Sequence, residues 1–177
     1  ELTAKEWLGV IDDLAALGCE RLTFTGGEPL SRPEWPRLAR RARQRGLVVD
    51  MITSGMGLDA AAVTKLRRAR LASVTVSVDG TAAVHDRLRG GAGRHAEALE
   101  AIRRLDRGGL RVGVTTQMNR LTLPTLDATA AEIQDAGAWG WQLQLTMPSG
   151  RAASQVDLVV APGEMAEVHR VIRRLQR

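Results

Sequence analysis

The chain has 177 residues, of which 44% are hydrophobic and 25% are charged, and its formal net charge is +5. This composition excludes a disordered chain and gives one domain enough apolar material for a core. No apolar run reaches the roughly 18 residues of a membrane span, and residues 1–5 lack a signal-peptide pattern, so we expect a cytoplasmic protein without membrane contact.

Apolar residues at helical spacing predict that the first element is a helix over residues 3–18, opened by Thr3 as N-cap with Glu6 three positions later. A strand is predicted at 21–25, a helix at 33–45 that ends at Gly46, and a second strand at 47–52. In the predicted helix at 33–45, no aromatic residue lies between the arginines, which are Arg37, Arg40, Arg41, Arg43 and Arg45. We therefore expect a solvated helix face there and no nucleic-acid partner.

The alternation of strands and helices continues to the end of the chain. Helices are predicted near 58–69, 92–107, 122–135 and 163–176, and strands at 73–78, 110–116 and 140–146. Strands that alternate with helices pair in parallel, so the predicted class is α/β, with five strands in a single domain over residues 1–177. Because a βα series should begin with a strand, we also expect a strand upstream of the first helix.

Small and polar residues follow each predicted strand, and in parallel α/β folds these carboxyl ends form one ligand-binding rim. They are the segments 26–29, 53–55, 77–80, 117–119 and 147–151. In the first segment, Gly26 and Gly27 let the backbone approach a ligand closely, and Glu28 offers a carboxylate to a cation such as an ammonium group. The alternative for these glycines is a plain strand-to-helix turn.

A polar segment after the third strand, which we predict to be a loop, holds four ionisable residues within five positions. We expect Arg89 to bind a carboxylate through paired hydrogen bonds. For His85 and Asp86 we favour structural roles, either pairing with each other or capping the following helix.

Taken together, the segments Thr25-Gly-Gly-Glu-Pro29, Thr53-Ser-Gly55, Ser77-Val-Asp-Gly80 with His85 to Arg89, and Pro148-Ser-Gly-Arg151 resemble the radical S-adenosylmethionine (radical SAM) superfamily. The pattern is closest to the peptide-modifying maturases with a SPASM-type cysteine-rich extension, such as those that mature the pyrroloquinoline quinone precursor and the sulfatases. The resemblance implies a partial (β/α) TIM-like barrel.

The resemblance also implies S-adenosylmethionine as a cofactor. Gly26, Gly27 and Glu28 would bind its amino group, Ser54 and Ser77 would lie near its ribose with Asp79 beside them, and Arg89 would hold its carboxylate. An apolar strip for the adenine is expected from Val76, Val114 or Met118. The family often has asparagine where this chain has Ser54.

The family holds a [4Fe–4S] cluster through three cysteines spaced C-x-x-x-C-x-x-C after the first barrel strand, and this chain lacks that motif. Its single cysteine, Cys19, cannot replace the motif and is expected to be a small buried residue. We therefore expect no metal ligands in this chain, cluster ligands upstream of it, and no activity from it alone.

For the complete protein, the resemblance implies reductive cleavage of S-adenosylmethionine to a 5′-deoxyadenosyl radical that abstracts hydrogen from a peptide or small-molecule substrate. An electron donor such as a flavodoxin or ferredoxin would be its partner. Trp139 and Trp141 are expected to be packing residues. The substrate-side candidates are Asn119, Gln142, Gln144 and Arg151.

Two alternatives remain open at this point. One is a cluster-free relative that keeps the barrel as a scaffold for binding a peptide or protein. The other is an unrelated barrel enzyme for a phosphorylated metabolite, with Gly26-Gly27 or Gly90-Gly91 as a phosphate cradle. No lysine lies near either glycine pair, and Glu28 would repel a phosphate.

Overall fold

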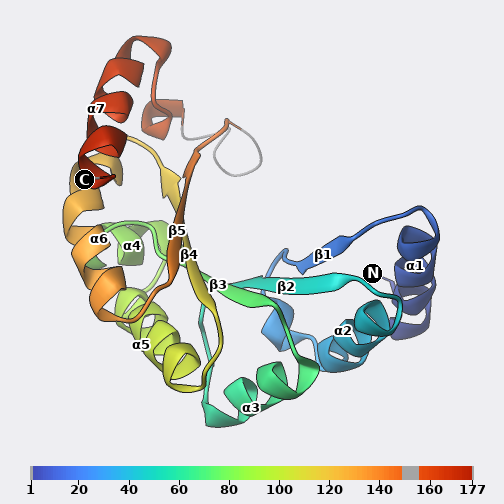
Figure 1. Ribbon diagram of the computed structural model, residues 1–177. Helices are drawn as coiled ribbons and strands as arrows, with labels where there is room; N and C mark the ends of the chain where they lie inside the picture. Colours follow the sequence, from blue (N-terminus) through green and yellow to red (C-terminus); the bar gives the residue numbers. More distant parts are fainter. Residues whose placement is uncertain (1, 149–155, 177) are drawn as a thin grey trace.

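Five parallel strands form one sheet, with the strands in the same order as in the sequence (Figure 1). The computed structural model describes residues 2–148 and 156–176. The strands are β1 (Arg21–Phe24), β2 (Val48–Thr53), β3 (Ser73–Ser77), β4 (Val112–Met118) and β5 (Gly140–Leu145). The predicted α/β class, the five strands and their parallel pairing are confirmed.

The helices lie in an arc around the outer side of the curved sheet, and the inner side is open (Figure 1). They are α1 (Ala4–Ala16), α2 (Trp35–Gln44), α3 (Ala60–Ala69), α4 (Ala82–Arg89), α5 (Arg94–Arg107), α6 (Leu126–Asp135) and α7 (Met165–Leu175). Among the described residues, no helix is long and apolar enough to cross a membrane.

The two faces of the sheet differ sharply in chemistry because successive residues of a strand point to opposite sides. The register aligns Met51 with Val74, and Val74 with Val112, and these side chains are buried against the helices. The same register aligns Asp50 with Ser73 on the opposite face. The open, concave face therefore carries polar side chains, whereas the outer face builds the core.

The core consists of two clusters. The larger lies between the outer face of the sheet and the helices, and the smaller, around Met118, Leu126, Val168 and Val171, fastens α7. Trp141 packs against both clusters, and its indole N–H donates to Thr116 Oγ1 at 2.9 Å. The prediction that Trp141 is a packing residue is thus confirmed.

The predicted N-cap of the first helix is present as a reciprocal capping box. Thr3 Oγ1 accepts from Glu6 N at 3.3 Å, and Thr3 N donates to Glu6 Oε2 at 2.7 Å. Both bonds satisfy amide groups that the first helical turn would otherwise leave unpaired.

The loop predicted around His85 to Arg89 is wrong, because these residues form α4. Thr81 is its N-cap, and Gly90 ends it in the left-handed conformation, with φ 72°. The sequence did contain helix signals here: Thr81 as N-cap, two alanines after it, and Gly90 at the end. The polar composition of the segment led to the loop prediction instead.

Three other expectations about packing are also wrong. Cys19 is exposed, and the Trp139 side chain is 70% exposed, because both residues lie next to the starts of strands, outside the core. The expected adenine strip of Val76, Val114 and Met118 is buried on the helix-facing side of the sheet. Those three side chains cannot reach a ligand on the concave face.

Candidate functional site

Glu28 fastens the loop after β1 to the loop after β2. Its Oε1 accepts from Thr53 Oγ1 at 2.7 Å and from Leu30 N at 3.1 Å, and its Oε2 accepts from Ser54 N at 2.8 Å and Ser54 Oγ at 2.6 Å. An ionised carboxylate has about four lone-pair positions, so protein donors use them all. Glu28 therefore acts as the brace of this rim.

Gly26 and Gly27 form the accessible part of the same loop. A Cβ atom at either position would have no neighbour within 4 Å, so a ligand can approach their backbone directly, and Gly26 has φ 121°, which suits glycine. Within the described part of the chain, no hydrogen bond is made to the carbonyl oxygen of Gly26 or Gly27. These two oxygens are free acceptors at the carboxyl end of β1.

Asp79 is the corresponding brace after β3. It is 4% exposed, its Oδ2 accepts from Arg89 Nε at 2.8 Å and lies 2.6 Å from Arg89 Nη2, and its Oδ1 accepts from Gln117 N at 2.9 Å. The carboxylate thus connects β3, α4 and β4. Asp79 is too enclosed to contact a ligand and positions Arg89 instead.

Arg89 keeps part of its guanidinium available. Its side chain is 33% exposed, and its third nitrogen, Nη1, makes no hydrogen bond among the residues that the structure describes. The Asp79 carboxylate holds the other two nitrogens, so the guanidinium has a fixed orientation and Nη1 remains available to a ligand.

His85 and Asp86 have structural roles, as expected. Asp86 caps α5, because its carboxylate accepts from Gly93 N at 2.7 Å and His95 N at 2.8 Å, and these bonds lower the pKa of Asp86. His85 does not pair with Asp86; its Nδ1 accepts from Asp79 N at 2.9 Å. Burial, the largest cause, lowers the pKa of His85 to about 4, so the ring is neutral at pH 7.

We expect the free energy of unfolding to fall as the pH drops from 6.5 to 4, since unfolded His85 takes up a proton near its ordinary pKa of 6.5 whereas folded His85 stays neutral to about pH 4. The slope from this group is at most about 1.4 kcal/mol per pH unit, and it vanishes below pH 4. Chemical denaturation at several pH values measures it. His85→Gln, which keeps an acceptor for Asp79 N, should flatten the curve in this window, and an unchanged curve would contradict the assignment.

The concave face between these braces is lined by hydroxyl and amide groups. The register aligns Ser77 with Thr115, and Thr115 with Gln142, and it aligns Gln117 with Gln144. Gln117 Nε2 donates to Gln144 Oε1 at 2.9 Å. Thr115 is 8% exposed, and its Oγ1 has no hydrogen-bond partner among the described residues.

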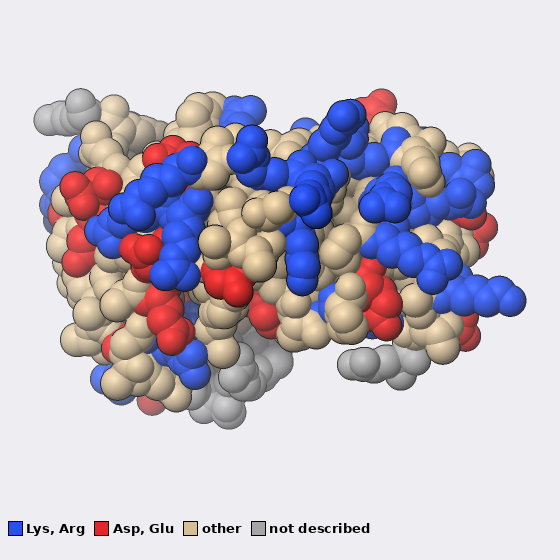
Figure 2. Space-filling view, turned by 90° about the horizontal axis from the view of Figure 1, so that it is seen from below, with Lys and Arg blue, Asp and Glu red and all other residues tan. Residues whose placement is uncertain are grey.

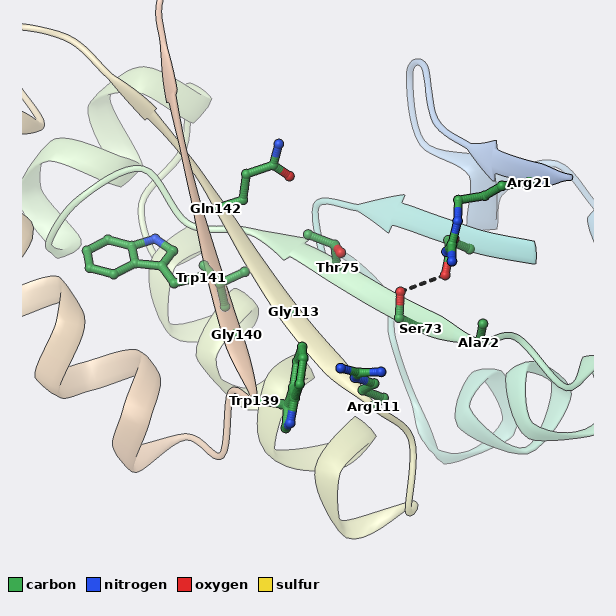
Figure 3. Close-up of a pocket in the computed structure, with 12 residues that line it drawn as sticks. Arg21, Ala72, Ser73, Thr75, Arg111, Gly113, Trp139, Gly140, Trp141 and Gln142 are labelled. Atoms are coloured by element: carbon green, nitrogen blue, oxygen red, sulfur yellow. Dashed lines mark hydrogen bonds and ion pairs between the residues drawn. The ribbon is translucent and has the colours of Figure 1, made fainter. Parts of the chain in front are cut away.

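The substrate-side candidates do not gather in one place. Gln142 and Gln144 share the concave face, as Figure 3 illustrates for Gln142, which points away from Trp141. Asn119 is 4% exposed, and its Oδ1 accepts from Leu121 N and Thr122 N, so the turn after β4 occupies it. The geometry does not favour a substrate contact for Asn119. Arg151 lies outside the described residues.

A cavity of about 440 Å³ opens at the other end of the concave face, where the strands begin (Figure 3). Ser73 Oγ donates to Asp50 Oδ1 at 2.7 Å, and Arg21 pairs with the same carboxylate. The Arg111 guanidinium lies 3.3 Å from the centre of the Trp139 ring. Our sequence analysis missed this cavity; an acid at position 50, inside an apolar strand, was the signal that could have indicated a polar inner face.

The family model described as "Radical SAM superfamily" matches residues 1–136. The chain is 34% identical over 177 residues to PqqA peptide cyclase of Rhodopseudomonas palustris, covering 94% of this chain and 47% of the relative. It is 34% identical over 128 residues to Fe-coproporphyrin III synthase of Methanosarcina barkeri, covering 72% of this chain and 32% of that relative. The chain thus spans about a third to a half of these curated relatives.

Two solved structures share the fold at low sequence identity. Streptococcus suis SuiB bound to S-adenosylmethionine superposes with a TM-score of 0.81 at 10% identity, over 99% of this chain and 40% of SuiB. Native anSMEcpe with bound AdoMet superposes with a TM-score of 0.75 at 14% identity, over 94% of this chain and 49% of that chain.

Proposed function

The chain belongs to the radical SAM superfamily, and we propose that it supplies the S-adenosylmethionine-binding part of an enzyme that acts on a peptide. The whole enzyme would cleave this cofactor reductively and use it to remove a hydrogen atom from the substrate. An external reductant, such as a flavodoxin or ferredoxin, would supply the electron.

The observation that carries the proposal is the pair of free carbonyl oxygens at Gly26 and Gly27, held in place by the Glu28 brace. An ammonium group has three donors and needs acceptors in a fixed arrangement. We therefore assign the cofactor's amino group to these backbone oxygens, next to Glu28 in the sequence. This refines the expectation from the sequence, in which the Glu28 carboxylate shared the direct contact.

The remaining parts of the cofactor also find matching groups. Ser54 and Ser77 lie at the ends of β2 and β3, where their hydroxyls would pair with the ribose, and Ser54 would act there as an acceptor because its hydrogen is donated to Glu28. Arg89 offers Nη1 to the carboxylate, while Asp79 keeps the guanidinium oriented. The residues present thus suit an amino acid head group and a diol.

The superfamily uses a [4Fe–4S] cluster with this cofactor, and the described residues do not fit one. Cys19 is the single cysteine, and residues 2–148 and 156–176 contain no group of three histidine, cysteine or acidic side chains placed to hold a metal ion. We propose that the cluster ligands belong to a part of the protein outside this chain.

A peptide is the substrate that the concave face suits best. Gln117, Gln142 and Gln144 present side-chain amides on this face, and amides pair with peptide N–H and C=O groups. Structures of SuiB with the precursor peptide SuiA, and of anSMEcpe with a peptide, superpose on the chain with TM-scores of 0.80 and 0.77. Other relatives are named for haem synthesis, so activity of the complete protein on a tetrapyrrole instead of a peptide would contradict the proposed substrate.

We expect the complete protein, reconstituted with iron and sulfide under anaerobic conditions and reduced, to convert S-adenosylmethionine to 5′-deoxyadenosine. Glu28→Ala should weaken cofactor binding by about 1 to 3 kcal/mol, because the loop that presents the two carbonyl oxygens loses its brace. Equilibrium dialysis with labelled cofactor and quantification of 5′-deoxyadenosine measure the two effects.

Glu34→Ala is the matched control for this experiment, since Glu34 lies in the next turn and its one ion pair among the described residues is with Arg32, at 3.5 Å. It should bind the cofactor like the unmodified protein. Equal binding by Glu28→Ala and Glu34→Ala would remove the assignment of the Glu28 rim. Cofactor binding without any bound iron or 5′-deoxyadenosine would favour the cluster-free scaffold.

A further inference from the structure

The outer surface between α2 and α3 contains a cavity of about 640 Å³ that is rich in cations. Pro36 and Ala69 give it an apolar part, and Figure 2 shows basic side chains gathered on the face that includes α3. We name this site the basic groove, after its five lining cations: Arg40, Arg43, Lys65, Arg68 and Arg70.

The charge of the basic groove is not neutralised within the described chain. All five cations are exposed, and none of them forms an ion pair with a described residue. By contrast, Arg41 and Arg45 on another side of α2 both bind Asp12 of α1. Arg40 with Arg43, and Lys65 with Arg68, are three residues apart on their helices, where like charges repel. The groove thus concentrates positive charge that a bound anion would relieve.

Arg70 adds an independent observation. It ends α3 in the left-handed conformation, with φ 53° and ψ 51°, and it is the only non-glycine residue with positive φ in the described chain. At ten other positions with positive φ the chain has glycine, which adopts this conformation without steric cost. The arginine is therefore present at a position where glycine would be the more stable choice, and its side chain lines the groove.

The position of the groove separates it from the cofactor rim. Arg43, Arg68 and Arg70 lie in or directly after the last turns of α2 and α3, from which β2 and β3 follow, whereas the rim lies where these strands end. Pro36, in the first turn of α2, extends the groove along that helix. A strand of six residues, such as β2, spans roughly 20 Å. A partner bound in the groove would leave the rim open, and it would be poorly placed to deliver an electron there.

We propose that the basic groove docks an acidic segment of a partner polypeptide. Its cations come from two facing helices and match a short run of carboxylates, and its apolar part suits side-chain methylenes. No aromatic side chain for stacking bases is among the described residues that line the groove. These features favour a peptide over a nucleic acid.

The test measures how tightly the complete protein binds a fluorescent twelve-residue peptide of alternating Glu and Ala. The binding of a twelve-nucleotide single-stranded DNA with the same label is measured separately for comparison. We expect the peptide to bind, with an affinity that falls as salt rises. The double variant Arg43→Glu, Arg68→Glu should weaken binding by at least about tenfold.

The matched control is Arg107→Glu, Arg173→Glu, which makes the same change in net charge at two other last helical turns, at exposed arginines without an ion pair among the described residues. It should change binding by less than about twofold. A third variant, Arg70→Gly, should weaken binding while the melting temperature stays equal or rises, because glycine relieves the left-handed conformation. Equal losses in the two double variants, unchanged binding by Arg70→Gly, or tighter binding of the DNA would overturn the proposal.

Discussion

We expect Asp79→Ala to lower the free energy of unfolding by about 3 kcal/mol. Asp79 is 4% exposed, and removal of its carboxylate leaves the backbone N–H of Gln117 and the guanidinium of Arg89 without their shared acceptor. Removing one partner of a buried pair costs about 3 to 5 kcal/mol, and the partial exposure of Arg89 moves the value to the lower end. Chemical denaturation followed by tryptophan fluorescence measures the change.

Two further variants test the cause of this loss. Asp79→Asn keeps an oxygen for Gln117 N but replaces the acceptor of Arg89 with an NH2 group, so it should recover only the part of the loss that comes from Gln117 N. Asp135→Ala removes an aspartate that pairs with Arg103 at 3.4 Å on the surface and is 80% exposed, and it should stay within about 0.5 kcal/mol of the unmodified protein. Similar values for Asp79→Ala and Asp135→Ala would show that Asp79 does not brace the rim.

The second large effect is expected at Gly55, where Gly55→Ala should lower the free energy of unfolding by about 3 kcal/mol. Its φ is 83°, and a Cβ atom would stand 2.9 Å from Ala101 Cβ and 3.3 Å from Val76 Cγ1. The left-handed conformation costs about 1 to 2 kcal/mol for a residue with a side chain, and overpacking of a core costs about 1 to 3 kcal/mol. The same denaturation measurement applies.

Gly57→Ala separates these two costs. Gly57 also has positive φ, 66°, but a Cβ there would meet nothing within 4 Å, so only the conformational cost of about 1 kcal/mol should appear. Adding Ala101→Gly to Gly55→Ala should recover part of the loss despite the weaker helix, because the nearest clash disappears. Equal destabilisation by Gly55→Ala and Gly57→Ala would contradict the close packing of this turn against α5.

Sequence reasoning predicted which residues lie at the ends of strands better than it predicted their contacts. Glu28, Ser54 and Ser77 were singled out because they lie at or just beyond strand ends, and the parallel sheet places strand ends on one rim. Arg89 was singled out as a charged residue of a predicted loop, and it lies at the end of α4. Their hydrogen-bond partners could not be predicted. Glu28 accepts from Thr53 and Ser54, which are 25 and 26 positions away, and the Asp79 carboxylate accepts from a backbone N–H 38 positions away.

Errors arose where the face of an element mattered. Val76, Val114 and Met118 were expected beside the cofactor, yet the pleat turns them toward the helices. Residues 73–77 alternate serine or threonine with valine, so the sequence showed one polar and one apolar face, and the error was to place the cofactor on the apolar face. The loop predicted at α4 failed for a different reason: its polar side chains masked short-range helix signals at Thr81 and Gly90.

The sequence by itself determined the order of the strands and helices, the parallel class of the sheet, the capping box at Thr3 and the place of the rim, because local periodicity and capping depend on residues a few positions apart. Only the tertiary structure decided that Glu28 and Asp79 are braces, that Gly26 and Gly27 keep free carbonyl oxygens, and that α2 and α3 form the basic groove. These features depend on strand register and helix packing, which bring together groups that are distant in the sequence.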